Sequence, residues 1–171
     1  EGLCRIRLGS LEPRIVTEAF TRRLSAIDKV CPHFHLSLQS GCNETLVRMN
    51  RKYTTEEYAR CCELLRKYFK NPALTTDVIV GFPGETSEEF ECTKAFVQRI
   101  GFAKMHIFKY SKRQGTRAAS MENQVDENIK NTRSDEMLEL DARMNDDFIR
   151  QWAGETVEVL LEEAAVVDGR R

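Results

Sequence analysis

The stretch Leu74-Thr75-Thr76-Asp77-Val78-Ile79-Val80-Gly81-Phe82-Pro83-Gly84-Glu85 decides the fold that this sequence predicts. Residues 74–80 form an apolar run of strand length, and the Gly-Phe-Pro-Gly sequence at 81–84 ends it in a turn. Ser87 then stands at a helix N-cap position, and a helical pattern continues to about Ile100. A strand followed closely by an amphipathic helix is the repeating unit of α/β proteins with parallel sheets.

The same order of strand and helix recurs before and after this unit. The predicted elements are, in chain order, an alternating strand at 3–8, a helix at 17–27, a strand at 34–38, a short helix near 44–49, a helix at 55–69 and a strand at 104–110. The helix at 55–69 is entered through the Thr-x-x-Glu pattern of a capping box. Four strands separated by helices predict parallel pairing with right-handed crossovers, as in half of a barrel or an open α/β sheet.

The pattern changes after the fourth strand. A polar loop at 111–123 leads into a long helix at about 126–152. Residues 156–162 then alternate like the first strand of another unit. We therefore divide the chain into a domain at 1–152 and the beginning of a second domain at 153–171.

The composition limits what bulk charge can explain. The 171 residues carry 26 lysines and arginines against 27 acidic residues, a formal net charge of -1. Neither a nucleic acid nor a membrane surface follows from that balance. The sequence has no apolar run of bilayer length and no signal-peptide layout, so we expect a soluble, cytoplasmic protein with no membrane partner. The first residue is not methionine, from which we expect the chain to be part of a longer one.

Metal-ligating residues are not spaced for a local metal site. The six cysteines lie at positions 4, 31, 42, 61, 62 and 92, with neither Cys-x-x-Cys nor Cys-x-x-x-Cys spacing. We expect reduced thiols, several of them buried. His33 and His35 alternate on one predicted strand, and His106 lies on another. Scattered histidines in a strand-rich core usually pack or form hydrogen bonds, so we predict no metal site.

Polar and turn-forming residues follow each predicted strand. The four segments are 9–13, 39–41, 81–85 and 111–113. The carboxyl ends of parallel strands share one edge of the sheet, where backbone groups and helix N-termini point into the same space. We expect one shared pocket at this edge; the alternative is that the glycines and prolines serve turn geometry alone.

Local charge is uneven although the net charge is close to zero. From Arg99 to Arg117 the chain carries six positive charges and no acid, with aromatic residues between them, whereas from Met121 to Asp147 nine acids stand against three basic residues. A basic strip with neighbouring aromatics suits phosphate contacts and base stacking on RNA. The alternative is a solvated strand end and loop whose aromatics pack in the core. The RNA-binding candidates are Lys109, Tyr110, Lys112, Arg113 and Arg117.

Several of these segments together resemble a known enzyme family. The runs 77–86, 38–41, 49–51 and 110–119 resemble, in this order along nearly the whole chain, the second half of the radical S-adenosylmethionine (SAM) domain of the methylthiotransferases. Within that family, the runs 7–13 and 31–41 are most similar to the branch that modifies threonylcarbamoyladenosine in tRNA. The tail at 156–163 resembles the opening strand of the RNA-binding TRAM domain.

The resemblance implies a fold and an activity. The fold is α/β, the second half of a radical SAM partial TIM-type barrel with about four parallel strands, a long C-terminal helix and the start of a TRAM-like β domain. The intact enzyme would add a methylthio group at C2 of N6-threonylcarbamoyladenosine, with the tRNA anticodon stem-loop as its partner. The alternatives are the isopentenyladenosine enzyme, the ribosomal-protein aspartate enzyme and a non-catalytic RNA-binding module.

The resemblance also implies cofactors and residues that bind them. The family uses S-adenosylmethionine and two 4Fe-4S clusters, whose cysteine motifs this chain lacks, so it implies cluster ligands outside the chain, no catalytic residue within it and an inactive chain by itself. The candidates for S-adenosylmethionine are Gln39 for the ribose, Arg51 for the methionyl carboxylate, Ser10 and Glu12 for the amino group or the nucleoside, and Ile79 and Gly81 for the adenine.

Half a barrel leaves one edge of its sheet without a partner strand. If 3–8 is the strand at that edge, unpaired backbone groups stand beside apolar side chains such as Leu8, Leu36 and Val78 on the concave face. We therefore expect the chain to self-associate through this strand or to cover the open side with its own acidic helix or tail.

Overall fold

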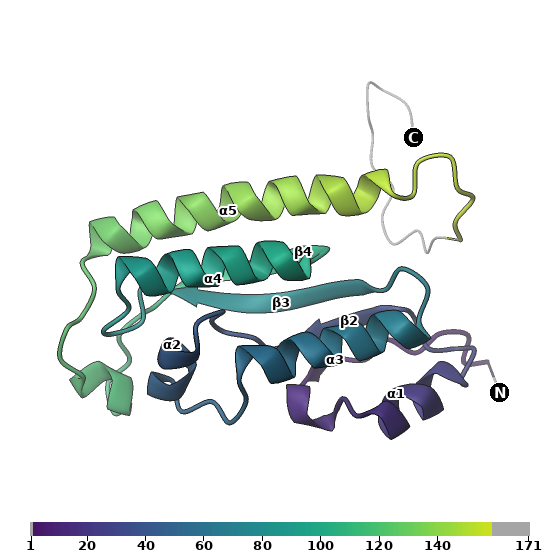
Figure 1. Cartoon of the computed structure of the whole chain (residues 1–171), viewed down its shortest axis with the longest axis horizontal. Helices are drawn as coiled ribbons and strands as arrows, with labels where there is room; N and C mark the ends of the chain where they lie inside the picture. Colours follow the sequence, from purple (N-terminus) through teal and green to yellow (C-terminus); the bar gives the residue numbers. More distant parts are fainter. Residues whose placement is uncertain (1, 159–171) are drawn as a thin grey trace.

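A computed structural model describes residues 2–158 of the chain, with a four-stranded parallel sheet in the order β1-β2-β3-β4 (Figure 1). The strands are β1 (Ser10–Leu11), β2 (His33–Leu36), β3 (Ala73–Val80) and β4 (Lys104–Lys109). The helices are η1 (Pro13–Ile15), α1 (Glu18–Ser25), α2 (Asn43–Arg48), α3 (Thr55–Tyr68), α4 (Ser87–Ile100), η2 (Arg117–Ser120) and α5 (Glu127–Arg150). The predicted α/β class with four parallel strands is confirmed.

Capping boxes set the start of two helices that cover the sheet. In α3 the Thr54 hydroxyl accepts from the Glu57 N–H at 3.3 Å, and the Glu57 carboxylate accepts from the Thr54 N–H at 2.8 Å. The same reciprocal pair joins Thr86 and Glu89 at the start of α4. Thr86 is therefore the N-cap of α4, and Ser87, which the sequence analysis placed there, is the first helical residue.

The first strand is shorter than predicted and lies further along the chain. The predicted strand at 3–8 contributes one isolated bridge, between Ile6 and Val30, and the ladder resumes only at β1. Between these two points Pro32 has no N–H to donate, and the His33 N–H donates locally to the Cys31 carbonyl at 2.7 Å. Residues 32 and 33 therefore offer no backbone N–H to a neighbouring strand, and a continuous ladder between this segment and residues 3–8 cannot form.

The two faces of the sheet carry different side chains. Phe34 and Leu36 of β2 and Val78 of β3 are completely buried, in one core with residues of α3, α4 and α5. Leu36 and Val78 were expected on the concave face, and that expectation is wrong because the strand period of two turns them toward the helices. Their neighbours in the sequence, His35 and Asp77, face the opposite side, which we call the open face.

Buried hydrogen bonds hold β2 to β3 and to α3 on the covered face. The carbonyl of Leu36 accepts from the Tyr58 hydroxyl at 2.9 Å and from the Thr76 hydroxyl at 2.5 Å. The Thr76 oxygen in turn accepts from the Leu38 N–H at 3.0 Å. Burial raises the pKa of Tyr58 well above its ordinary value, so its hydroxyl remains a donor at physiological pH.

The C-terminal part of the chain is described up to residue 158. Of the strand expected at 156–162, residues 156–158 are not in a strand, and the remainder lies outside the described residues, as does most of the second domain expected at 153–171. Glu158 forms an ion pair with Arg5 beside the open edge of the sheet. The expected self-association through this edge remains a prediction. No helix within residues 2–158 combines the length and the apolar character needed to cross a bilayer.

Helix α5 is anchored to the sheet by buried polar contacts. Asp141 accepts from the Met105 N–H of β4 at 2.6 Å and pairs with Lys104. Arg133 donates to the Glu85 carboxylate at 2.7 Å and to the Glu85 carbonyl at 3.1 Å. The side chains of Arg133 and Glu85 are only 8% and 1% exposed. Removing one member of a buried ion pair leaves the other charge uncompensated.

We therefore expect Arg133→Met to lower the free energy of unfolding by about 3 kcal/mol, the cost of breaking a buried ion pair. Arg150→Met is the matched control, because Arg150 is on the same helix but lies in an exposed pair with Asp147 at 3.7 Å. The Arg150→Met substitution should cause no measurable change in the free energy of unfolding. Urea denaturation of both variants measures the difference. Equal losses in the two variants would show that the Arg133 contact does not anchor α5.

Candidate functional site

The loops that follow the strands meet at one edge of the sheet, which we call the carboxyl edge. In Figure 1 it lies on the left, together with α2 and the N-terminus of α5. The Gly84 N–H donates to the Asn123 carbonyl at 2.9 Å, and the Tyr110 N–H donates to the Val80 carbonyl at the same distance. The loop after β3 is therefore tied both to the segment that precedes α5 and to the end of β4.

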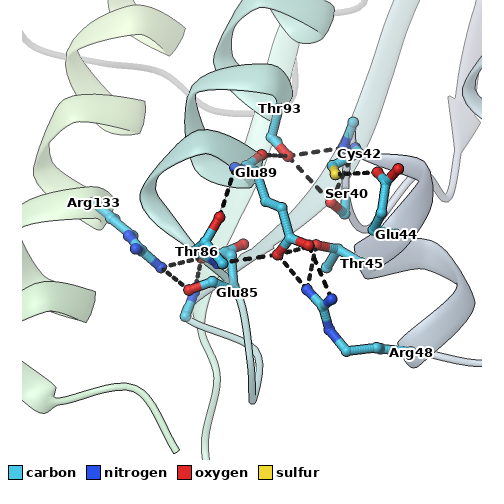
Figure 2. Close-up of polar contacts among 12 residues, drawn as sticks. Ser40, Cys42, Glu44, Thr45, Arg48, Glu85, Thr86, Glu89, Thr93 and Arg133 are labelled. Carbon is cyan, nitrogen blue, oxygen red and sulfur yellow. Dashed lines mark hydrogen bonds and ion pairs between the residues drawn. The ribbon is translucent and has the colours of Figure 1, made fainter. Parts of the chain in front are cut away.

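The loop between β3 and α4 is closed around the buried carboxylate of Glu85. The Gly81 N–H donates to this carboxylate at 2.7 Å, and Arg133 approaches it from α5 (Figure 2). Gly81 has φ +71°, and a Cβ at this position would stand 2.4 Å from Cγ of Lys130. The glycine is thus required by the turn and by the close approach of Lys130. Lys130 occupies the direction that a Cβ of Gly81 would take, and the expected approach of an adenine to Gly81 remains a prediction.

A second part of the network joins α2 to α4. Arg48 donates to the Glu89 carboxylate with both terminal nitrogens, one at 2.9 Å, and the Thr45 hydroxyl donates to it at 3.4 Å (Figure 2). Burial of Glu89 opposes its ionisation, but hydrogen bonds from Arg48 and from the Thr86 N–H outweigh burial and lower the pKa of this carboxyl. The ion pair therefore persists at neutral pH.

The same network reaches the residues that follow β2. The Thr93 hydroxyl of α4 lies 3.1 Å from the Ser40 hydroxyl and accepts from the Gly41 N–H at 3.2 Å. A Cβ on Gly41 would stand 2.7 Å from Cβ of Phe96, so this position has no room for a side chain. The segment 40–42 is fixed against α4, and it fixes the residue before it.

Gln39 has an unusual backbone conformation at the end of β2. Its φ is +74°, in the left-handed region that residues other than glycine seldom adopt. Its N–H donates to the Asp77 carbonyl at 2.8 Å, and its carbonyl accepts from the Ile79 N–H at 2.9 Å, so Gln39 lies opposite Val78 and is hydrogen-bonded to Ile79. Strained conformations of this kind concentrate at functional sites. The structure therefore brings together two of the predicted cosubstrate residues.

Tyr53 is a residue of this edge that the sequence analysis missed. Its hydroxyl donates to the carbonyls of Ser37 and Leu38, both at 2.8 Å, and so fixes the backbone just before Gln39. Burial raises the pKa of Tyr53 to about 12, while the positive charge of Arg51 lowers it and the negative charge of Glu12 raises it. Arg51 and Glu12 thus lie within electrostatic reach of the same buried phenol. A lone tyrosine between two predicted helices gave no sequence signal for this role.

The remaining cosubstrate candidates are exposed. The carboxylate of Glu12 caps η1 by accepting from the Arg14 N–H at 3.2 Å. Ser10 is exposed and lines a hollow on the open face together with His35. Arg51 is also exposed, in the loop that joins α2 to α3. Gln39, Glu12 and Arg51 therefore follow β2, β1 and α2 in the chain, and Ile79 is near the end of β3, whereas Ser10 is in β1 and lines the hollow on the open face.

The predicted RNA-binding residues divide into two groups. Lys112, Arg113 and Arg117 are exposed in the segment after β4, and Lys112 and Arg117 line the same hollow. Lys109 is exposed and donates to the Asn131 side chain at 2.8 Å. The ring of Tyr110, in contrast, packs edge-to-face on Phe82, with a centroid distance of 5.3 Å.

The exposed aromatic residue of β4 is a different one. Phe108 is 53% exposed, and it lies opposite Ile79 in the β3–β4 register. Phe108 is thus the aromatic side chain that this strand presents to solvent, and Tyr110 contributes to packing.

The family of the chain follows from this architecture and from its sequence. The model of the Radical SAM superfamily matches residues 4–97, which include β1, β2, β3 and most of α4. The chain belongs to the radical SAM superfamily. The strands β1, β2 and β3 and the loops that follow them are thus parts of a radical SAM domain.

Two relatives with similar sequences are tRNA-modifying enzymes by name. The chain is 44% identical, over 164 residues, to threonylcarbamoyladenosine tRNA methylthiotransferase MtaB of Bacillus subtilis (strain 168), covering 96% of this chain and 36% of the relative. It is 43% identical, over 166 residues, to tRNA-2-methylthio-N(6)-dimethylallyladenosine synthase of Clostridium novyi (strain NT), covering 95% of this chain and 36% of the relative. The chain therefore spans about a third of the length of the curated relatives it matches.

A solved structure supports the fold. The chain superimposes on coproporphyrinogen III oxidase (HemN) from Escherichia coli, a radical SAM enzyme, with a TM-score of 0.67 and 19% sequence identity. The match covers 82% of this chain and 32% of HemN. At this identity the likeness concerns the fold, and it agrees with a partial TIM-type barrel.

The carboxyl edge has donors and acceptors suited to S-adenosylmethionine, the cosubstrate that the family implies. Arg51 has a guanidinium that can meet a carboxylate, Gln39 has an amide that can donate and accept, and Glu12 has a carboxylate that can meet an ammonium group. These chemical groups match the methionyl and ribose portions of the cosubstrate. The Gly81 N–H donates to the Glu85 carboxylate, and the position of Gly81 beside the adenine remains a prediction.

The cysteines of the described residues do not suit an iron-sulfur cluster. All six are free thiols, and within residues 2–158 no three of them come together at one site. Cys42, Cys61 and Cys62 are buried, and burial raises the pKa of Cys61 to about 11 and that of Cys62 to about 12. Clusters are bound by thiolates, which such pKa values disfavour. That the ligands lie outside this chain remains a prediction.

The backbone of Gln39 allows a direct test of strain at the site. We expect Gln39→Gly to be more stable than Gln39→Ala by about 1 kcal/mol, because only glycine adopts a positive φ without steric cost. The same pair of substitutions at Ser37, whose φ is not positive, should show the opposite order. Thermal and urea unfolding of the four variants gives the comparison. A more stable alanine variant at position 39 would show that this backbone is not strained.

Proposed function

We propose that this chain forms the carboxyl-terminal part of the radical SAM barrel of a tRNA methylthiotransferase that acts on N6-threonylcarbamoyladenosine. The observation that carries this proposal is the 44% identity to the Bacillus subtilis enzyme over 164 residues, which are 96% of this chain. The intact enzyme would work in the cytoplasm, on the anticodon stem-loop of tRNA. Its cluster ligands, and therefore its catalytic centre, would lie in parts of the protein outside this chain.

In this proposal the carboxyl edge binds and orients the cosubstrate. S-adenosylmethionine supplies the reactive radical chemistry when it is bound with an iron-sulfur cluster. The guanidinium of Arg51 holds the methionyl carboxylate, Glu12 meets the amino group, and the amide of Gln39 meets the ribose hydroxyls. Tyr53 and the Thr93 network hold these groups in position, because they fix the backbone on both sides of Gln39. A site whose polar groups are fixed in advance orients its ligand without reorganising.

The RNA would approach over the segment that follows β4. Lys112, Arg113 and Arg117 are exposed there, next to the carboxyl edge, and can neutralise phosphates of a tRNA loop. Phe108 and Ile79 form an apolar surface on the open face near the proposed cosubstrate position. A TRAM-like domain beginning at about residue 153 would add a second RNA-binding unit.

A second candidate substrate is dimethylallyladenosine in tRNA. It is favoured by the 43% identity to the Clostridium novyi synthase, which is close to the identity with the threonylcarbamoyladenosine enzyme. The two substrates differ in the group on N6, one being charged and the other apolar. The residues that contact the N6 substituent would therefore determine which of the two nucleosides is the substrate.

The test is to express the full reading frame that contains this chain in a bacterial strain lacking both tRNA methylthiotransferases and the ribosomal-protein methylthiotransferase, and to digest its tRNA and, separately, its ribosomal proteins for mass spectrometry. We expect the 2-methylthio form of threonylcarbamoyladenosine to appear. The 2-methylthio form of dimethylallyladenosine, which is the same nucleoside as isopentenyladenosine, would establish the second candidate instead. Methylthiolated aspartate in a ribosomal protein, or no methylthiolated product at all, would contradict the proposal, the latter in favour of a non-catalytic RNA-binding module. The 171-residue chain expressed by itself should restore neither nucleoside.

We expect Arg51→Ala in the intact, cluster-loaded enzyme to weaken S-adenosylmethionine binding roughly 10- to 100-fold, because a hydrogen bond to a charged group contributes about 1.5–3 kcal/mol. Lys52→Ala is the matched control, since Lys52 is the next residue, is exposed and donates to the Asn50 side chain. Calorimetric titration measures both affinities, and iron analysis verifies equal cluster content. An unchanged affinity for Arg51→Ala would remove this residue from the site.

A further inference from the structure

Three side chains that can bind a metal ion lie together on the open face of the sheet. They are His35 of β2, Asp77 of β3 and His106 of β4, and their ligand atoms all lie within 4.8 Å of one another. Asp77 and His106 are direct partners in the β3–β4 register, and His35 pairs with Thr75, one diagonal step from Asp77. Three adjacent strands thus place one ligand each on the same face.

The distances suit a shared metal ion. Nε2 of His35 lies 3.3 Å from Oδ2 of Asp77. In a tetrahedral site with metal–ligand bonds of about 2.0–2.1 Å, two ligand atoms stand about 3.3 Å apart. The rings of His35 and His106 have centroids 5.8 Å apart and are tilted by 38°, so they are not stacked face to face. The ligand atom of His106 lies within 4.8 Å of those of His35 and Asp77.

A neighbouring residue orients the first imidazole. Nδ1 of His35 lies 3.1 Å from the Thr75 hydroxyl, which engages that nitrogen and leaves Nε2 toward Asp77. Metal-ligating histidines usually have such a partner on their second nitrogen. The His35 side chain is 14% exposed and that of Asp77 is 28% exposed, whereas His106 is exposed, so the group is partly shielded and can be reached from solvent.

Among the residues that the structure describes, the Asp77 carboxylate forms no ion pair with a lysine or an arginine. The hollow in front of the group, about 580 Å³, is lined by Arg7 and Lys104 as well as by the three ligands. Arg7 donates to His33 at 3.1 Å, and Lys104 pairs with Asp141. Among the described residues, Asp77 has His35 as its ion-pair partner and no lysine or arginine. A carboxylate that has no lysine or arginine partner attracts a cation from solution.

We propose that His35, Asp77 and His106 form a binding site for a divalent first-row transition metal ion, of which Zn²⁺ is the simplest example. Two imidazoles and one carboxylate suit such ions, whereas Mg²⁺ and Ca²⁺ prefer oxygen ligands alone. Three protein ligands leave a fourth position facing the hollow. The site stands about 7 Å along β3 from Ile79, two residues further from the carboxyl edge, so it is distinct from the proposed cosubstrate residues. It replaces the sequence-based expectation of no metal site.

The test uses the metal-free 171-residue chain with its reactive thiols alkylated, titrated with Co²⁺ and monitored by visible absorption. We expect one Co²⁺ per chain with the absorption of nitrogen and oxygen ligands, and its displacement by Zn²⁺. His106→Gln and Asp77→Asn should each weaken binding at least about 100-fold, more than the loss of a ligand-orienting partner does. Thr75→Val should weaken it about 10- to 100-fold.

The matched control is His33→Gln, because His33 is on the same strand and face but outside the group of three. It should bind Co²⁺ as the unchanged chain does. As a second readout, Zn²⁺ should raise the melting temperature of the unchanged chain and of His33→Gln, but not that of Asp77→Asn. Circular dichroism verifies that each variant is folded. Absence of Co²⁺ binding, an absorption band of thiolate ligation, or equal losses in His33→Gln and His106→Gln would overturn the proposal.

Discussion

The alternation of side chains along a parallel strand is the constraint on which the rest of this structure depends. On β2 and β3, one set of residues is mostly apolar and buried beneath α3, α4 and α5, and the intervening set, which includes His35, Thr75 and Asp77, faces the open side. Helices can cover only the apolar face, since burial of the other would leave histidine and aspartate groups without water. The covered face therefore provides stability, and the open face and the carboxyl edge remain available for chemistry.

The carboxyl edge shows how a fold positions groups that a ligand can use. The peptide conformation at Gln39 is unfavourable by itself, but Tyr53 fixes the backbone before it and the Ser40–Thr93 contact fixes the backbone after it. The buried Glu85–Arg133 pair ties the next loop to α5 (Figure 2). None of these contacts touches a cosubstrate in our proposal. They hold the residues that do, and this explains why the loops are dense in charged and hydroxyl groups.

Much of the fold could be predicted from the sequence, because helix caps and apolar periodicity are local signals. The capping-box pattern before α3, the extent of α4 and the parallel order of the strands all follow from such signals. The first strand could not be placed, because its length depends on the missing donor of Pro32 in another segment. The faces of Leu36 and Val78 depend on where the helices pack. Tyr53 and the His35–Asp77–His106 group depend on contacts between residues distant in the sequence, which a single sequence does not reveal.

The order of the strands in the sheet is also their order along the chain. Each new strand is therefore added to the outer side of the one made before it, and no later strand has to insert between two that are already paired. During synthesis the amino-terminal elements can pair as they leave the ribosome, while the later ones are still being made. Among the described elements, the long helix α5 follows the four strands and packs along β4. A nascent chain with this topology can gain structure steadily, one strand and helix at a time.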